Sequence, residues 1–374
     1  MTSTNDNGVL VVGAGPTGLS AALFLHDRGL PVRIVDKSAG PSTTSRAQVV
    51  NPRSLELLET TGVTAAIVAE SHPIRSVRWY EHWQPLAEID FETLQSAFQM
   101  RVIPQARTEA LLTEALAQRG IEVEREIELS GFVDHGASVS AQLSGKGGNP
   151  NRFEAALLLA ADGAHSLVRE TLGIEFPGHN FPEAWPLYDI ELADPLTPDH
   201  AHVSFVENGL IFCLCIRPGL WRVFGNVENL LDHLPAGSKL GNVGWNSLFH
   251  IGDRVASELA VGRIALAGDA AHIHSPVGAR GMNLGMEDAY VYAVCAEDVI
   301  KGRPERMKDY SRLRHPIHKT VVSRMDRLTA LARGRPNWVG LLRHYLIPTM
   351  ADVGPLTRIM RHFLTGLDHP VRLH

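Results

Sequence analysis

The stretch GRIALAGDAAHIHSPVGARGMNLGMEDA, residues 262–289, joins a short apolar strand, an acidic residue and a glycine-rich turn that opens a helix. Residues 264–267 form an apolar run of the kind that is buried in a parallel sheet. Gly268 and Asp269 end this run, at a place where a carboxylate can accept hydrogen bonds from sugar hydroxyls. Gly281 begins a helical pattern whose first N–H groups can face an anion or an electron-rich ring edge. The stretch therefore predicts a bound flavin, whose reduced ring is negatively charged.

The N-terminal residues carry a second, independent pattern. An apolar strand at residues 9–12 is followed by Gly13, Gly15 and Gly18 in the spacing G-x-G-x-x-G, and then by a helix. Gly13 allows a tight turn, Gly15 lets the backbone approach a pyrophosphate, and Gly18 permits close packing of the helix on the strand. A second strand ends in Asp36, roughly twenty residues after the last glycine, where a carboxylate binds ribose hydroxyls. A plain turn in an α/β core is the alternative, but the context favours dinucleotide binding.

With these two stretches the chain resembles the group A flavoprotein aromatic hydroxylases, the family of para-hydroxybenzoate hydroxylase. Residues 161–169, ADGAHSLVR, are similar to the family's DG motif, which is associated with FAD and reduced nicotinamide. Ser45-Arg46-Ala47 resembles the segment whose arginine lies beside the flavin, and Gln105 with Glu109 resembles the helix whose glutamine touches the cofactor. The motifs occur in the family's order, and the resemblance covers most of the chain.

The strand pattern and the resemblance together predict a mixed α/β fold. We expect a Rossmann-like FAD-binding domain interleaved with a mostly antiparallel β-sheet substrate domain, followed by a C-terminal helical tail. The FAD-binding domain is predicted at residues 1–72, 100–175 and 258–310, the substrate domain at 73–99 and 176–257, and the helical segment at 311–374. Strands that face the substrate are expected at 187–192, 202–206, 210–217 and 220–227.

The resemblance implies FAD as the bound cofactor and NADH or NADPH as a transient reductant. It also implies that O2 adds to the reduced flavin at C4a and that the resulting hydroperoxide hydroxylates an aromatic or related planar substrate. A flavin-dependent reductase or oxidase of the same fold stays an alternative, because function resides in the site and not in the fold. The residues expected at the cofactor are Gly13, Gly15, Gly18, Asp36, Lys37, Arg46, Gln105, Asp162, Gly163, Gly268, Asp269, Gly281, Met282 and Asn283.

For the catalytic step, the protein must hold the substrate ring in place and exclude water. Arg46 and Pro276 are expected to position the flavin. A base is expected for phenolic substrates, but the sequence does not identify one among His202, His250, His272, His274 and Tyr188. The sequence identifies no arginine for a substrate carboxylate, although Arg217 and Arg222 occur at the right end of the predicted sheet. Arg280 stands where relatives are expected to carry an uncharged residue. The residues expected at the substrate are Tyr188, Phe205, Cys213, Phe224 and Pro276.

Composition restricts the partners. A net charge of −6 argues against a nucleic-acid surface, which needs a clustered excess of lysine and arginine. The three cysteines form no disulfide framework, and Cys213 and Cys215 are expected on one face of a strand. The polar first residues lack the pattern of a secretory signal, and no apolar run reaches membrane-spanning length. We therefore expect a cytoplasmic monomer or homodimer whose partners are a small aromatic substrate, O2 and NAD(P)H.

Overall fold

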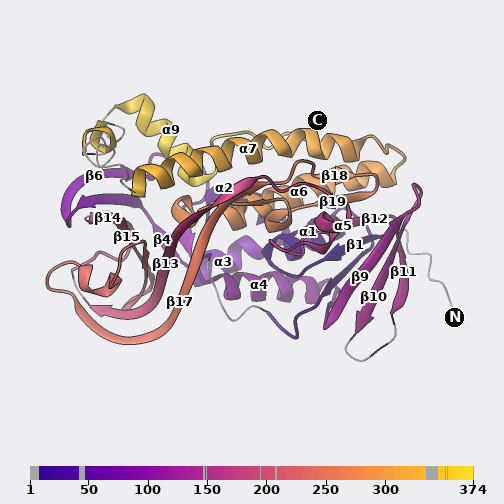
Figure 1. The fold of residues 1–374 in the computed structure, drawn as a ribbon, viewed down its shortest axis with the longest axis horizontal. Helices are drawn as coiled ribbons and strands as arrows, with labels where there is room; N and C mark the ends of the chain where they lie inside the picture. The colour runs from indigo at the N-terminus through magenta and orange to yellow at the C-terminus, as the bar shows by residue number, and fades with distance from the viewer. Residues whose placement is uncertain are drawn as a thin grey trace.

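The computed structural model describes residues 8–41, 47–145, 148, 150–193, 195–206, 209–333, 344–349, 351 and 353–373. A six-stranded sheet with the order β18-β19-β12-β1-β2-β8 lies in the half of the molecule that carries the N-terminus (Figure 1). Its strands pair in parallel except at β18. The bounds are β1 Val9–Val12, β2 Val32–Asp36, β8 Val123–Arg125, β12 Leu157–Ala160, β18 Ala260–Val261 and β19 Ile264–Leu266.

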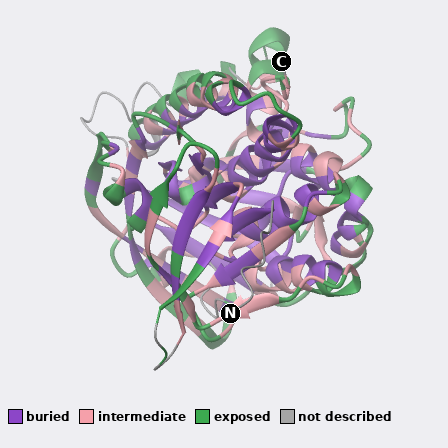
Figure 2. Ribbon diagram, turned by 90° about the vertical axis from the view of Figure 1, so that its right-hand side faces the viewer, coloured by how far each residue is buried: buried purple, intermediate pink, exposed green. Residues whose placement is uncertain are grey.

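Helices and a small antiparallel sheet bury this parallel sheet. The central strands β1 and β12 are apolar at every position, as expected for a sheet covered on both faces. The covering elements share one apolar core with the sheet, and Figure 2 shows the buried residues gathered at the centre of the molecule. These elements are α1 Pro16–Asp27, α4 Gln105–Gln118, α6 Gly281–Ile300, β9 Ile127–Asp134, β10 Val139–Gly145 and β11 Asn151–Ala155.

A second, eight-stranded sheet has the order β20-β17-β13-β16-β15-β14-β5-β6 and is antiparallel except between β14 and β5. The long strands β13 and β17 curve around it at the left of Figure 1. Because β17 pairs with β20, this sheet is joined directly to the stretch that follows β19. The bounds are β5 Ser76–Glu81, β6 Gln84–Asp90, β13 Gly178–Ala193, β14 His200–Val206, β15 Gly209–Arg217, β16 Leu220–Gly225, β17 Lys239–Val255 and β20 His272–Ile273.

Strand alternation gives the second sheet two apolar faces. On β15, Leu210, Phe212 and Leu214 belong to one buried cluster, whereas Cys213 and Cys215 belong to another. This is the period of two that a strand imposes on its side chains. The expectation that both cysteines share one face agrees with this arrangement.

Shorter elements connect the two large sheets, and two helices follow them. The helix α7 runs along one side of the molecule over both halves, with α9 near its far end (Figure 1). None of the helices in the described ranges is long and apolar enough to cross a membrane. The predicted mixed α/β fold with C-terminal helices is confirmed, whereas the domain boundaries stay a prediction. The bounds are β3 Val49–Val50, α2 Pro52–Leu58, α3 Val63–Glu70, β4 His72–Ile74, β7 Met100–Val102, α5 Leu167–Thr171, α7 Arg306–Arg333 and α9 Gly354–Thr365, with 3₁₀ turns at Glu59–Thr61, Leu230–His233, Gly268–Ala270 and Pro276–Gly278.

Candidate functional site

The turn between β1 and α1 has the geometry of a dinucleotide site. Gly13 has a φ of 102°, and a Cβ there would lie 2.2 Å from the carbonyl oxygen of Ala161. A Cβ at Gly18 would lie 1.9 Å from the carbonyl oxygen of Gly13, so the fold itself requires both glycines. At Gly15, in contrast, a Cβ would meet no described atom within 4 Å. Gly15 also precedes α1, which begins without a side-chain cap, so its first N–H groups face open space.

Asp36 lies at the end of β2, beside this turn. One carboxylate oxygen accepts a hydrogen bond from the Ala14 N–H at 2.7 Å, and the other accepts one from the Ser38 N–H at 2.7 Å. Arg125 lies 3.6 Å from the same carboxylate, and Lys37 is exposed. The carboxylate is thus held next to the glycine turn, where the sequence places a ribose-binding acid.

The DG motif lies against the same turn through Ala161. One oxygen of Asp162 is buried and has no hydrogen-bond partner within the described ranges, and Gly163 has a φ of 85°. Burial raises the pKa of Asp162, an effect that its hydrogen bonds with Ser166 and Val168 oppose. A buried acceptor without a partner is costly, so this oxygen fits a ligand that brings a hydroxyl or N–H donor.

The residues after β19 complete this arrangement. Gly268 has a φ of 61°, and a Cβ there would lie 2.5 Å from the Thr17 hydroxyl. A Cβ at Gly285 would lie 2.2 Å from the same hydroxyl, so α6 packs closely on α1. Asp269 is exposed between buried neighbours. Three segments distant in sequence, 13–18, 161–163 and 268–269, therefore meet in one place, which we call the nucleotide cradle, and its open Gly15 and unpartnered Asp162 oxygen fit a dinucleotide.

The start of α6 gives a more limited result than the sequence predicts. The helix begins at Gly281 without a side-chain cap, and Met282 is partly buried. The side-chain amide of Asn283 donates to the carbonyl oxygens of Val49 and Ala279, both at 2.8 Å, and its oxygen accepts from the Asn51 N–H at 2.9 Å. The side chain of Asn283 therefore holds α6 against β3 and α2, and its expected contact with the cofactor, through the N–H groups at the helix start, stays a prediction.

Of the remaining expected cofactor residues, the structure describes Gln105, the first residue of α4. The side chain of Gln105 accepts from the Ala47 N–H at 3.4 Å and donates to Glu109 at 2.8 Å, so it joins α4 to the segment that leads into β3. Arg46, expected to position the flavin, lies outside the described residues.

A large cavity lies between one face of the eight-stranded sheet, the turn Pro276–Gly278 and the C-terminal helices. It encloses about 1050 Å³, counting the part open to solvent. Phe205, Phe224 and Pro276 line it, as the sequence predicts for substrate contacts, and Phe224 stacks on Phe212 with ring centroids 4.7 Å apart. The lining side chains are all apolar: Val49, Ile74, Val77, Trp79, Ile89, Met100, Ala201, Val203, Phe205, Leu210, Phe212, Leu214, Phe224, Pro276, Val277, Ala279, Leu328, Ile347, Met360 and Leu364, with Gly278.

Two expected substrate residues do not reach this cavity, which is a correction. Tyr188 and Cys213 pack in the cluster on the opposite face of the sheet, with Ile190 and Trp221. Strand alternation places Cys213 away from the face that carries its neighbours Phe212 and Leu214. The same alternation places Leu210, Phe212 and Leu214 together on one face, although both faces of the strand are apolar and the pattern does not say which one meets the cavity. No local pattern points to Met360 or Leu364.

The candidate acids, bases and anion-binding residues also lie elsewhere. His202 is buried against the Tyr80 hydroxyl, and burial lowers its pKa to about 4, so its ring is neutral and structural. His250 and Arg217 are exposed, and the Arg222 guanidinium pairs with both carboxylate oxygens of Asp189, each at 2.7 Å. Thus, within the described part of the chain, the cavity wall presents no titratable side chain.

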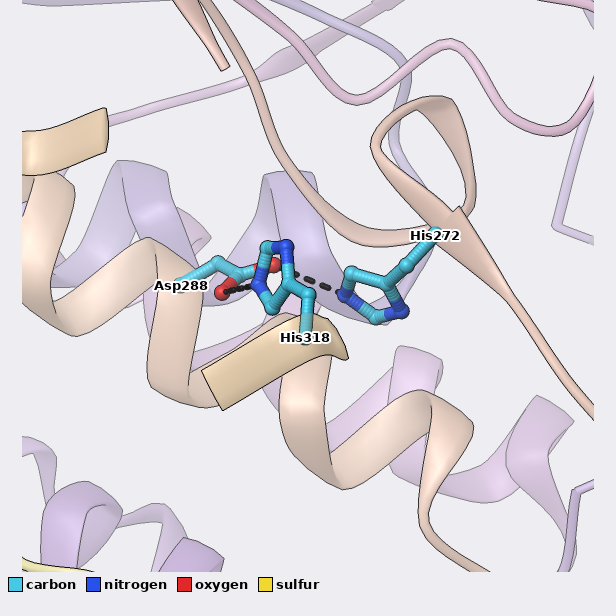
Figure 3. Close-up of side chains that lie close together, drawn as sticks. All are labelled: His272, Asp288 and His318. Atoms are coloured by element: carbon cyan, nitrogen blue, oxygen red, sulfur yellow. Dashed lines mark hydrogen bonds and ion pairs between the residues drawn. The ribbon is translucent and has the colours of Figure 1, made fainter. Parts of the chain in front are cut away.

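A fully buried group of polar side chains lies where β20, α6 and α7 meet. Figure 3 shows His272 and His318 converging on Asp288, with their Nε2 atoms 2.9 and 2.6 Å from its two oxygens. The Arg314 Nε donates to the same carboxylate at 2.7 Å. Burial alone would raise the pKa of Asp288, but His318, Arg314 and His272 hold it well below its ordinary value. Because the guanidinium already neutralises this carboxylate, the group is an ion network that joins β20, α6 and α7 and not a metal centre.

Another histidine and an acid hold the residues next to Pro276. Burial lowers the pKa of His274 to about 3, and its Nδ1 lies 2.8 Å from the carbonyl oxygen of Ser275. The Ser275 N–H donates to the buried Asp253 carboxylate at 3.0 Å. These contacts fix the loop 275–279, which forms one wall of the cavity.

A nucleotide cradle on a parallel sheet, beside an apolar cavity on a second sheet, defines a dinucleotide-dependent enzyme. The FAD binding domain family matches residues 6–211 and 227–325. The chain is also 33% identical to 6-methylpretetramide 4-monooxygenase of Streptomyces rimosus, over 98% of this chain and 69% of that protein. The chain belongs to this family, among the group A FAD-dependent aromatic hydroxylases, and it is an FAD-dependent monooxygenase.

Solved structures show the same fold. The p-nitrophenol 4-monooxygenase PnpA of Pseudomonas putida DLL-E4 superposes with a TM-score of 0.85 at 21% identity, covering 96% of this chain and 98% of that one. The anhydrotetracycline hydroxylase OxyS of Streptomyces rimosus superposes with a TM-score of 0.80 at 27% identity, covering 97% of this chain and 76% of that one.

Proposed function

We propose that the protein uses NADH or NADPH and O2 to hydroxylate an apolar, fused-ring aromatic compound. The observation that carries this proposal is the cavity, in which Phe205, Phe212 and Phe224 face a space bounded by Pro276 and Val277. Flat aromatic walls suit a flat aromatic ligand, and a wall without charges favours one with few ionised groups. The name of the Streptomyces rimosus relative, 6-methylpretetramide 4-monooxygenase, supports the same class.

The residues of the nucleotide cradle would hold FAD. The N–H groups at the start of α1 would bind the pyrophosphate beside Gly15, and Asp36 would bind the adenosine ribose. Asp162 and Asp269 would accept hydrogen bonds from further hydroxyls. When bound, FAD supplies the redox chemistry, taking hydride from the nicotinamide and activating O2.

The protein's own contribution is orientation and exclusion of water. The loop 275–279 is hydrogen-bonded to Asp253, follows the cradle residues 268–269 in sequence and lines the cavity, so it would set the distance from cofactor to substrate. The apolar wall would keep water from the reacting atoms. The predicted domain division, the cytoplasmic location and a monomer or homodimer are further parts of this proposal.

Rapid-mixing absorbance tests the proposal. The purified flavoprotein is mixed with NADH or NADPH and then with oxygen, with and without a panel of phenols and fused aromatics. We expect fused aromatics to accelerate flavin reduction, and a transient flavin absorbance to precede reoxidation together with hydroxylated product. Rapid reoxidation without product for every compound would support an oxidase or reductase instead.

A further inference from the structure

Arg280 occupies an unusual position for a charged residue. It directly precedes α6 and follows the loop 275–279, and its side chain is fully buried. A cation at a helix N-terminus is opposed by the helix dipole, and burial adds a desolvation cost. The side chain therefore needs strong compensation from its surroundings. It does not point to solvent, and it faces the C-terminal segment instead.

The compensation comes from the C-terminal segment. The Arg280 Nη1 donates to Asp368 at 2.9 Å and also to the carbonyl oxygen of Phe363. The guanidinium carbon lies 5.2 Å from the centroid of the Phe363 ring. Arg280 and His369 together hold the pKa of Asp368 well below its ordinary value, against the opposing effect of burial. Arg280 thus joins the start of α6 to the end of α9 through an ion pair, a hydrogen bond to a backbone carbonyl and a cation–π contact.

Additional contacts fix the same segment. His369 Nε2 lies 2.7 Å from Glu287 on α6, and the Arg324 guanidinium donates to the second oxygen of Asp368 at 2.7 Å. The Arg53 guanidinium donates to the His369 carbonyl oxygen at 3.1 Å. Residues 363–369 are therefore held from α2, α6 and α7 at once, and Arg280 is the contact that lies nearest to the cavity loop in sequence.

This attachment matters for the cavity because α9 forms part of its wall. Met360 and Leu364 line the cavity, and Phe363, on the same face of α9, packs with Leu284 and Met325. The loop 275–279 meets the same group, since a Cβ at Gly278 would lie 2.6 Å from the Met325 methyl group. A displacement of α9 would thus open the cavity next to the loop.

We propose that Arg280 and Asp368 are positioning residues, which clamp α9 onto the start of α6 and so close the substrate cavity beside the cofactor. This inference rests on the proposed function for its catalytic consequence. Opening the wall would admit water, and reduced cofactor would then be spent on hydrogen peroxide in place of hydroxylated product. Arg280 would act through α9 and would not touch the reacting atoms.

The test uses Arg280→Gln, which removes the charge and shortens the side chain, and Asp368→Asn, which removes the charge with little change of volume. We expect both variants to retain FAD and its reduction rate, with about five-fold more peroxide per NAD(P)H consumed and a higher KM for the aromatic substrate. Arg280→Lys should restore part of the coupling. Arg306→Gln is the matched control, because the buried Arg306 also joins the tail to α6, through Leu373 and Asp298, but at the far end of that helix. It should lower stability and leave the peroxide ratio unchanged.

Hydrogen exchange of residues 354–373 separates this inference from the proposed function. Faster exchange there in Arg280→Gln and Asp368→Asn supports the clamp even if no tested compound is hydroxylated. The clamp is overturned if both variants exchange hydrogen and form peroxide at the wild-type level. It is overturned also if Arg306→Gln raises the peroxide ratio as much as they do.

Discussion

At the scale of single residues, the three glycines of the first turn have different structural roles. Gly15 has extended backbone angles, φ −79° and ψ −178°, which any residue adopts, and open space at its Cβ position. Gly13 and Gly18 have no such space. The motif G-x-G-x-x-G thus combines two glycines that the fold requires with one that only the ligand requires.

Two substitutions separate these roles. Gly15→Val should fold with wild-type stability, within about 1 kcal/mol, but purify without flavin, because the new side chain would occupy the pyrophosphate position. Gly18→Ala should lose about 3 kcal/mol or more, since its methyl group would overlap a backbone oxygen. Thermal unfolding and flavin content measure both effects. A full flavin complement in Gly15→Val would remove that glycine from the proposed site.

Asp253 predicts a pH effect on stability. Burial raises its pKa to about 6 from an ordinary value of 3.8, so the folded protein binds this proton more tightly than the unfolded chain. Stability should therefore fall as pH rises from about 4 to 6. Asp253→Asn keeps an oxygen for the Ser275 N–H and should stabilise the protein above pH 6 by about 1 kcal/mol, less than the full shift implies because solvent screens the carboxyl. Urea unfolding at several pH values would show it, and an unchanged pH profile in the variant would contradict it.

At the scale of elements, sequence reasoning succeeded where structure is local. Patterns within a few residues predict the strand–turn–helix at Gly13 and the antiparallel strands with their alternation. It failed for Tyr188 and Cys213, because the composition of a strand does not say which face meets the cavity. It also could not place Arg280, whose partner Asp368 lies at the other end of the chain and is brought near by the packing of α6, α7 and α9.

The attachment of α9 should depend on pH through His369. Burial alone would lower the pKa of this histidine, but Asp368 and Glu287 raise it above its ordinary value of 6.5. A raised folded-state pKa means that the stabilisation is fully present below pH 6.5 and is lost as pH rises through the folded-state pKa. Glu287 and Asp368 have lowered pKa values and stay ionised throughout this range, and the raised pKa of Arg314 keeps its guanidinium charged.

Hydrogen exchange measures this attachment when the protein is labelled at several pH values under otherwise identical conditions. Residues 366–371 should lose protection as pH rises above 6.5, after correction for intrinsic exchange rates. His369→Asn should show weaker protection that no longer varies with pH. A wild-type segment with constant protection across the range would show that His369 does not control the attachment.

At the scale of the whole molecule, the cavity is assembled from parts of the chain that no local pattern connects. The eight-stranded sheet supplies its aromatic face, the loop after β20 supplies the side nearest the cradle, and α7 and α9 supply the remainder. Each part is held by charges buried outside the cavity, at Asp288, Arg280 and Asp253, and not by charges inside it. The cavity that we propose for the substrate is therefore apolar, while buried polar residues outside it hold its walls.

This separation predicts how hydroxylation depends on pH. Because no described side chain of the cavity wall titrates, the pH profile of product formation should follow the phenol pKa of the substrate itself. A methyl ether of the same substrate should then react more slowly, with a rate that is flat from about pH 6 to 9. Asp253→Asn serves as the control for Asp253, whose carboxylate accepts a hydrogen bond from the loop. A bell-shaped profile with the ether, unchanged in that variant, would mean that a protein base acts on the substrate.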